Sequence, residues 1–134
     1  MGGNLNLTDV IAKDTRILVA DDEEIMRDTI VMQLQMSGFK NISEVENGLH
    51  ALQELSNKHY DLLITDTNMP GLNGYQVIRG YKANPQHNGT KFLAMGGGID
   101  QETQEIYASQ GVSFLNKPFR RDELLYAVNQ VLKN

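Results

Sequence analysis

The sequence contains no cysteine and no long run of hydrophobic residues. Without cysteine the chain can form neither disulfides nor thiolate zinc sites, and it has no cysteine nucleophile. No apolar stretch approaches the roughly 20 residues that a helix needs to cross a bilayer. Residues 1–7 also lack the basic start and the apolar segment of a secretory signal peptide. We therefore expect a soluble cytoplasmic protein.

Basic residues are in deficit as well. The chain has 12 Lys and Arg against 17 Asp and Glu, a formal net charge of −5. Because affinity for nucleic acids and anionic membranes comes largely from clustered Lys and Arg, we expect neither as a direct partner. The remaining composition, 40% hydrophobic and 22% charged over 134 residues, is typical of one ordinary globular domain.

Short apolar runs alternate along the chain with segments of helical periodicity. Residues 1–14 are mostly polar, and we interpret them as a tail that precedes a domain over residues 15–134. Continuous apolar runs, typical of strands buried on both faces, occur at residues 17–20, 62–64 and 92–95. Two more polar runs, at residues 42–46 and 112–115, are typical of the edges of a sheet.

Each run is followed by apolar residues at helical spacing. These residues are Met26, Ile30 and Leu34; Leu52 and Leu55; Val77, Ile78 and Tyr81; Ile106 and Tyr107; and the stripe Leu124, Leu125, Val128, Val131 and Leu132. The segment 100–110 is the weakest of the five. Serial strand–helix units predict an α/β fold with one doubly wound, five-stranded parallel sheet, flavodoxin-like and covered by helices on both faces. With the polar runs at the edges, the strand order is 2-1-3-4-5.

Charged residues stand directly after several of the predicted strands. Asp21 and Asp22 follow the first, Asp66 follows the third, and Lys117 follows the fifth. In such a sheet the ligand crevice lies at the carboxyl ends of the strands, so these side chains should meet there. Two carboxylates about 4 Å apart repel by about 4 kcal/mol at an effective dielectric near 20. Three of them therefore need a cation, or one must bind a proton.

Oxygen ligands without His or Cys suit Mg²⁺. Together, Mg²⁺ and Lys117 would neutralise a phosphoryl group attached to one aspartate, a side chain that can act as a covalent acceptor. Taken singly, the residues have simpler explanations: Asp21 and Asp22 as a helix cap, Asp66 as a turn cap, Lys117 as a solvated charge. Their joint placement at neighbouring strand ends favours a site.

Three motifs occur in order along the chain. They are Ile17-Leu18-Val19-Ala20-Asp21-Asp22-Glu23, Asp61-Leu62-Leu63-Ile64-Thr65-Asp66-Thr67-Asn68-Met69-Pro70-Gly71-Leu72-Asn73-Gly74, and Lys117-Pro118-Phe119. In this order they resemble the receiver domain of bacterial response regulators in two-component signalling, and the resemblance covers about residues 15–133. It implies phosphoryl transfer from a histidine kinase or phosphotransfer protein, and signalling to a downstream protein or a fused output domain.

The resemblance also implies roles for individual residues. Asp66 is expected to accept the phosphoryl group. Asp21 and Asp22 are expected to hold Mg²⁺ together with Asp66 and the backbone carbonyl of Asn68. Lys117 is expected to contact the phosphoryl oxygens, and the peptide bond that follows it is cis in similar domains.

The resemblance breaks at the end of the fourth strand, where receivers usually carry Thr or Ser followed by a small residue. Gly96 and Gly97 stand at these positions, so Gly96 offers no hydroxyl to a phosphoryl group, a bond worth roughly 1.5–3 kcal/mol. Either backbone N–H groups of the glycines bind the phosphate instead, or switching is altered. Phe114 matches the aromatic residue that changes rotamer on activation, and we expect its coupling to Asp66 to be atypical.

Two other functions fit part of the sequence. The missing hydroxyl at Gly96 also suits a receiver-like protein-interaction module that works without phosphorylation. Undiminished partner binding by an Asp66→Asn variant would support that alternative. Aspartate-nucleophile phosphatases resemble the same layout, but Asn68 stands where they need a second Asp as acid and base. We therefore expect a signalling module with at most self-catalysed phosphotransfer and autodephosphorylation, and no further enzyme activity.

Overall fold

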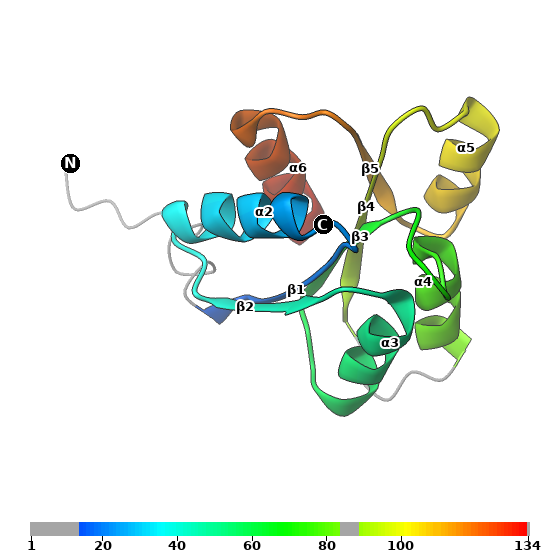
Figure 1. The fold of residues 1–134 in the computed structure, drawn as a ribbon, viewed down its shortest axis with the longest axis horizontal. Helices are drawn as coiled ribbons and strands as arrows, with labels where there is room; N and C mark the ends of the chain where they lie inside the picture. The colour runs from blue at the N-terminus through cyan, green and yellow to red at the C-terminus, as the bar shows by residue number, and fades with distance from the viewer. Residues whose placement is uncertain (1–13, 84–88, 134) are drawn as a thin grey trace.

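The structure, a computed structural model, describes residues 14–83 and 89–133. Almost all of the predicted tail over residues 1–14 lies outside the described residues. Within them, strands and helices alternate (Figure 1). Their order is β1 (Arg16–Ala20), α2 (Glu24–Met36), β2 (Asn41–Val45), α3 (Gly48–Asn57), β3 (Leu62–Asp66), α4 (Gly74–Ala83), β4 (Lys91–Gly96), α5 (Gln101–Ser109), β5 (Ser113–Asn116) and α6 (Arg121–Lys133).

The strands form one parallel sheet in the order β2-β1-β3-β4-β5. This confirms the predicted doubly wound topology. The predicted central strands are also the buried ones: every residue of β3 is buried, whereas β2 and β5 contain no fully buried residue. Edge strands tolerate polar side chains because one of their sides faces solvent.

Helices cover both faces of the sheet. Figure 1 shows α2 and α6 on one side and α3, α4 and α5 on the other. Successive side chains of a strand point to opposite faces, so β1 contributes to two separate hydrophobic clusters. Leu18 packs with residues of α3, α4 and α5, whereas Ile17 and Val19 pack with residues of α2 and α6.

Helix α5 forms where the apolar pattern is weakest. The side chain of Asp100 caps it by accepting a hydrogen bond from the backbone N–H of Thr103 at 2.8 Å, which satisfies one of the free donors at a helix start. Tyr107 is its one buried residue, and Ile106 remains 42% exposed. Local capping and a single aromatic anchor therefore hold this helix against the sheet.

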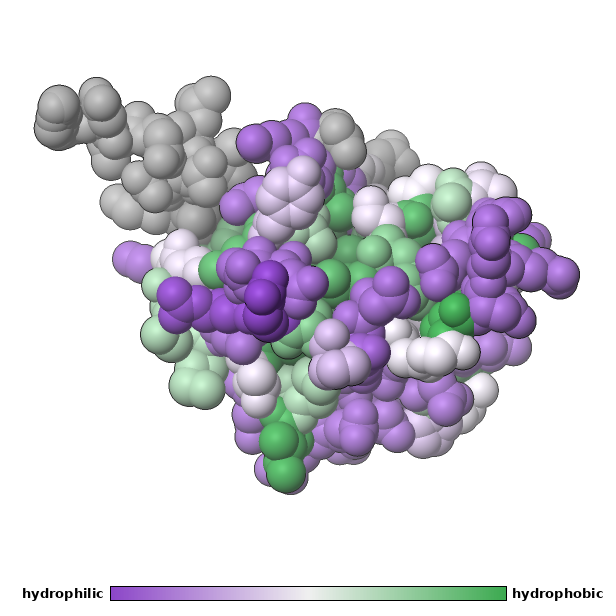
Figure 2. Space-filling model, turned by 90° about the horizontal axis from the view of Figure 1, so that it is seen from above, coloured by the Kyte–Doolittle hydropathy of each residue, from purple (hydrophilic) through white to green (hydrophobic). Residues whose placement is uncertain are grey.

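The surface is mostly hydrophilic. Figure 2 shows one face on which polar residues surround hydrophobic patches. Among residues 14–83 and 89–133, the exposed large apolar residues are Ile25, Met32, Met36, Leu49, Ile106 and Tyr126. Of the helices in the described part of the chain, none has the length and apolar character that crossing a membrane requires.

The start of α4 lies unusually close to the end of β3. A Cβ atom built on Gly74 would lie 2.6 Å from the carbonyl oxygen of Asp66 and 3.2 Å from Cγ2 of Thr65. The first of these distances is shorter than real Cβ contacts, and the neighbouring atom belongs to the backbone of the sheet. Glycine at this position thus allows the helix to begin directly beside Asp66.

We expect Gly74→Ala to lower the free energy of unfolding by about 1–3 kcal/mol, because the added methyl group has to push α4 away from β3. Urea denaturation measures this change. Gly97→Ala is the control, because a Cβ there meets its nearest neighbour at 3.4 Å, an ordinary contact. The control should stay within about 0.5 kcal/mol of the wild type. Equal stability of the two variants would contradict the steric argument.

Candidate functional site

Backbone hydrogen bonds fix the loops that follow β1 and β5. The N–H of Asp21 donates to the carbonyl of Val45 at 3.2 Å, and the N–H of Lys117 donates to the carbonyl of Gly96 at 2.8 Å. These bonds continue the sheet ladder past the ends of β1 and β5. Because Asp66 is the last residue of β3, three charged side chains are brought to the same edge of the sheet.

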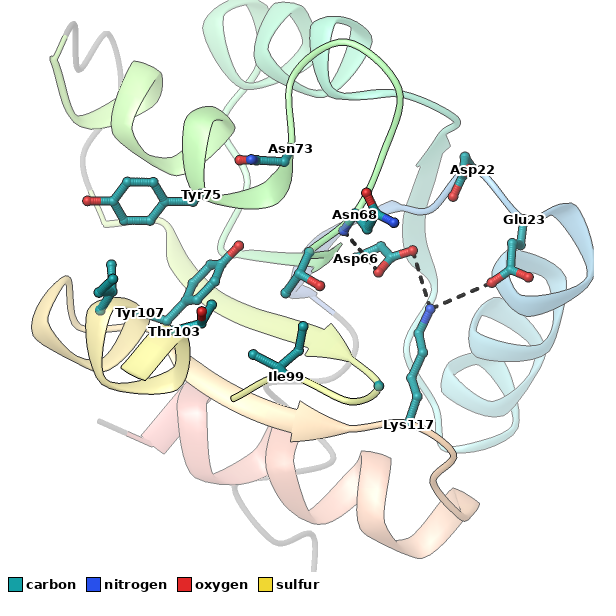
Figure 3. A pocket seen from close by; sticks show the side chains of 13 residues that line it. Asp22, Glu23, Asp66, Asn68, Asn73, Tyr75, Ile99, Thr103, Tyr107 and Lys117 are labelled. Atoms are coloured by element: carbon teal, nitrogen blue, oxygen red, sulfur yellow. Dashed lines mark hydrogen bonds and ion pairs between the residues drawn. The ribbon is translucent and has the colours of Figure 1, made fainter. Parts of the chain in front are cut away.

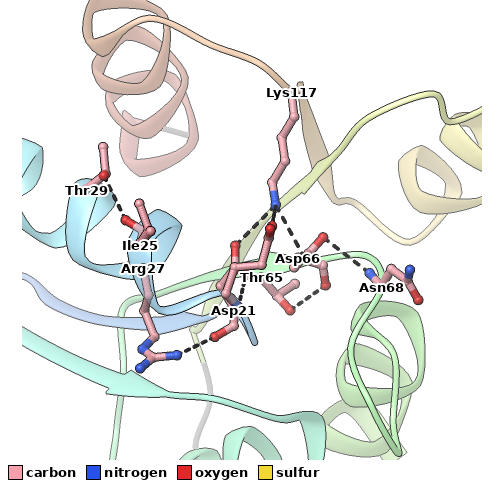
Figure 4. A network of polar contacts seen from close by, with 9 residues as sticks. Asp21, Ile25, Arg27, Thr29, Thr65, Asp66, Asn68 and Lys117 are labelled. Carbon is pink, nitrogen blue, oxygen red and sulfur yellow. Dashed lines mark hydrogen bonds and ion pairs between the residues drawn. The ribbon is translucent and has the colours of Figure 1, made fainter.

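Lys117 lies against three carboxylates at this edge, those of Asp21 and Asp66 (Figure 4) and that of Glu23 (Figure 3). Its Nζ atom is 3.2 Å from Oδ2 of Asp21 and 3.4 Å from Oδ2 of Asp66. The third distance, to Oε1 of Glu23, is 3.8 Å. The side chain of Asp21 is 0% exposed and that of Asp66 is 9% exposed, so both depend on Lys117 for compensation of their charge.

The pKa values in the cluster reflect its shortage of positive charge. Burial raises the pKa of the Asp66 carboxyl, and the Asp21 carboxylate raises it further; Lys117 and the N–H of Asn68 oppose this without cancelling it. Burial alone would lower the pKa of Lys117, but the charges of Asp66 and Asp21 outweigh burial and raise it. The site therefore holds Lys117 charged and disfavours ionised Asp66.

Asp21 is held in place from several directions. Its Oδ1 accepts a hydrogen bond from the N–H of Glu23 at 2.9 Å, and its backbone carbonyl accepts one from Nη1 of Arg27 at 2.8 Å. Arg27 also pairs with Glu44 on β2, Nε to Oε1 at 3.2 Å. Figure 4 shows Lys117 and Arg27 approaching Asp21 from different sides. Asp21 is consequently a rigid part of the site.

Asp22 and Asn68 complete the acidic side of the site. Asp21, Asp22 and Asp66 each offer a carboxylate oxygen, and these oxygens lie within 4.8 Å of one another. Asp22 is exposed, which leaves its carboxylate free to turn toward a cation. The N–H of Asn68 donates to Oδ1 of Asp66 at 3.3 Å. Three oxygen donors at this spacing, in a cluster short of positive charge, fit a hard divalent cation.

A pocket of about 730 Å³ opens beside Asp66 (Figure 3). One wall carries the charged cluster and the opposite wall carries Tyr75 and Tyr107, from α4 and α5. The residues that line it are Asp22, Glu23, Asp66, Thr67, Asn68, Asn73, Tyr75, Gly97, Ile99, Thr103, Ile106, Tyr107 and Lys117. The acceptor predicted from the sequence is therefore accessible from solvent, although its side chain is largely buried.

Three residues predicted for the site, Asp21, Gly96 and Phe114, do not line this pocket. Gly96 is buried at the end of β4, and Phe114 packs with the hydrophobic cluster beneath α4 and α5. The ring of Tyr107 contacts that of Phe114 at 5.9 Å between centroids, and it contacts Tyr75 at 5.7 Å. Tyr107 thus lies between Phe114 and the pocket. Its burial raises the pKa of its hydroxyl to about 12.

Sequence reasoning missed Glu23, Thr67 and Tyr107 as parts of the site. Glu23 follows the acidic pair directly, so its position in the first motif could have indicated it. Tyr107 is one of only two large apolar residues in its weak helix, which was a usable signal for a buried anchor. Nothing in the sequence indicated that Thr67 lines the pocket, because its position beside Gly96 of β4 follows from the packing of the folded chain.

Known proteins share this arrangement. Residues 17–129 match the response regulator receiver domain family. The chain belongs to this family. The receivers it contains are signalling modules of two-component systems that can be phosphorylated, and they interact with histidine kinases and downstream effectors.

Two curated relatives and one solved structure illustrate the similarity. The chain is 32% identical to the chemotaxis protein CheY of Bacillus subtilis, over 87% of this chain and 97% of that protein. It is 33% identical to the sensor protein EvgS of Escherichia coli K12 over 86% of this chain but only 9% of that much longer protein. The receiver domain of the sensor histidine kinase PA1611 from Pseudomonas aeruginosa superposes with a TM-score of 0.79 at 26% identity, covering 91% of this chain and all of that one. That structure has a magnesium ion coordinated in its active-site cleft.

We expect Asp66→Asn to stabilise this receiver at neutral pH without divalent cations. A carboxyl whose pKa is raised in the folded state costs stability once it is ionised. The gain from Asn should shrink as the pH falls through the raised pKa, and it should vanish below the ordinary Asp range, where both states bind the proton.

Urea denaturation at several pH values in the presence of a chelator measures this gain. Asp28→Asn removes an exposed carboxylate of α2 and serves as the control, with little change expected. An Asp66→Asn variant that is less stable than the wild type at pH 7 would show that Lys117 overcompensates the burial of Asp66.

Proposed function

We propose that this receiver accepts a phosphoryl group on Asp66 from a histidine kinase or a phosphotransfer protein. The contact of Lys117 with Asp66 at 3.4 Å, in the wall of an open pocket, carries this proposal. Burial disfavours the negative charge on the Asp66 carboxylate, and phosphorylation moves that charge onto the oxygens of an acyl phosphate, which Lys117, held by Asp21, can pair with.

The transfer forms one bond and breaks another. A carboxylate oxygen of Asp66 attacks the phosphorus of a phosphohistidine, and the phosphorus–nitrogen bond breaks. The electron pair stays on the imidazole nitrogen, which then takes a proton from solvent. Lys117 pairs with a phosphoryl oxygen throughout, and the N–H of Asn68 keeps the carboxylate oriented. Positioning and charge stabilisation are the principal contributions that a protein makes to phosphoryl transfer.

Mass spectrometry of the chain treated with acetyl phosphate tests this proposal. In the presence of Mg²⁺ the wild type should gain the mass of one phosphoryl group, and fragmentation should locate it on Asp66. Asp66→Asn should gain none, whereas Asp28→Asn should behave as the wild type. Phosphate on another residue, or none on the wild type, would contradict the assignment.

Mg²⁺ is the cofactor that the acidic cluster fits, and we propose Asp21, Asp22, Asp66 and the backbone carbonyl of Asn68 as its ligands. The close grouping of three carboxylate oxygens supports this set. When bound, the ion supplies positive charge that neutralises the phosphoryl oxygens during transfer. Lys117 already occupies one side of the cluster, so the ion and the ammonium would share the charge of the phosphoryl group.

Asp22→Ala should weaken Mg²⁺ binding by at least about tenfold, because it removes the exposed ligand without touching the pairs of Lys117. Isothermal titration calorimetry measures the affinity. Asp28→Ala removes the same charge from an exposed position of α2 and should leave the affinity unchanged. A similar loss in both variants would indicate a general charge effect in place of a ligand.

The output of this receiver is proposed to be atypical. Gly96 offers no hydroxyl, and Phe114 lies behind Tyr107 and outside the pocket. A signal that leaves Asp66 for the face formed by α5 and β5 therefore has to pass Tyr107. A downstream protein or a fused output domain in the cytoplasm is the proposed recipient of this signal.

A further inference from the structure

The side chain of Thr67 occupies the space beside Gly96. A Cβ atom built on Gly96 would lie 2.7 Å from Oγ1 of Thr67 and 2.9 Å from Cγ1 of Ile99. Both distances are shorter than real Cβ contacts. The volume that a side chain at position 96 would fill is therefore already taken, and its nearest occupant is a hydroxyl group.

The backbone holds Thr67 in this place. Its N–H donates to the carbonyl of Met95 at 2.9 Å, which ties the residue after Asp66 to the end of β4. Its carbonyl accepts a hydrogen bond from the N–H of Gly74 at 3.4 Å, at the start of α4. Thr67 lines the same pocket as Asp66 and Lys117, so this residue borders the space that a phosphoryl group on Asp66 would enter.

The other hydroxyl groups near Asp66 are engaged. Thr65 Oγ1 donates to the carbonyl of Asp66 at 3.0 Å, and the Thr103 hydroxyl bonds to the carboxylate of Asp100. Tyr107 takes a hydrogen bond from the backbone N–H of Tyr75. Within the described ranges, the Thr67 hydroxyl has no such partner.

We propose that the hydroxyl of Thr67 donates a hydrogen bond to the phosphoryl group on Asp66. It would thereby take the part that a Thr or Ser side chain at position 96 takes in similar domains. This inference rests on the proposed function, since it needs a phosphoryl group on Asp66. It makes Thr67 a phosphoryl-binding residue. It also explains why position 96 is glycine, because a side chain at that position would displace the Thr67 hydroxyl.

Binding of beryllofluoride, a phosphoryl mimic, in the presence of Mg²⁺ tests the role of Thr67. Thr67→Val keeps the shape of the side chain and removes the hydroxyl, whereas Thr67→Ser keeps the hydroxyl. We expect Thr67→Val to bind beryllofluoride about 10-fold to 100-fold more weakly than the wild type, the loss of one hydrogen bond to a charged group. Thr67→Ser should bind within about threefold of the wild type, a change below 1 kcal/mol.

Gly96→Ala provides a second, independent variant. Its methyl group should push the Thr67 hydroxyl aside and weaken beryllofluoride binding as Thr67→Val does. The double variant should lose little more than either single variant, because both remove the same hydrogen bond. Additive losses would contradict the idea that Gly96 acts through Thr67.

Three measurements distinguish a failure of the role of Thr67 from a failure of the proposed phosphorylation of Asp66. Mg²⁺ affinity measured without beryllofluoride should be equal in the wild type and Thr67→Val; a parallel loss would make Thr67 a structural residue and overturn the inference. Full beryllofluoride affinity in Thr67→Val would overturn it too, while phosphorylation of Asp66 in the same variant would leave the proposed function standing. A wild type that takes up neither beryllofluoride nor phosphate would overturn both.

Discussion

The ammonium of Lys117, held between carboxylates from two other strands, is the interaction on which the site depends. Asp21 is fully buried and Asp66 nearly so, and burying such groups without a cation is costly. Lys117 reaches them only because the chain returns β5 to the sheet edge next to β4. The topology therefore brings the charges together. Carboxylates outnumber the one ammonium in this cluster, so the arrangement fits an additional cation.

Most of the fold follows from the pattern of apolar residues. Strands such as residues 17–20 and 62–64 are apolar without interruption because helices cover them on both sides. The edge strands β2 and β5 could be recognised because their sequences contain polar residues. This pattern predicts which strands are central and which lie at the edges, whereas the strand order 2-1-3-4-5 relies in addition on the known doubly wound topology. Helix α5 was harder to predict, since its stability comes from the Asp100 cap and the anchor Tyr107 and not from an apolar stripe.

The charged half of the site could be predicted because its members directly follow strands whose ends must meet. The other half could not. Thr67 and Gly96 lie side by side although they are 29 positions apart in sequence. Such proximity depends on the positions of atoms to within a few tenths of an ångström. The position of Tyr107 between Phe114 and the pocket likewise depends on how α5 packs. A motif identifies the residue types at strand ends, whereas packing decides which hydroxyl or ring lies near Asp66.

A double-mutant cycle between Asp66 and Lys117 tests the central claim most directly. Free energies of unfolding are measured by urea denaturation at pH 7 with a chelator, for Asp66→Asn and Lys117→Met singly and together. Because Lys117 compensates Asp66, the Asn substitution should stabilise the Lys117→Met protein by at least about 1 kcal/mol more than it stabilises the wild type. The exposed pair of Arg120 with Asp122 should give a coupling below about 0.5 kcal/mol in the same experiment. Equal effects of Asp66→Asn in both backgrounds would mean that the two charges do not interact, and would contradict the account.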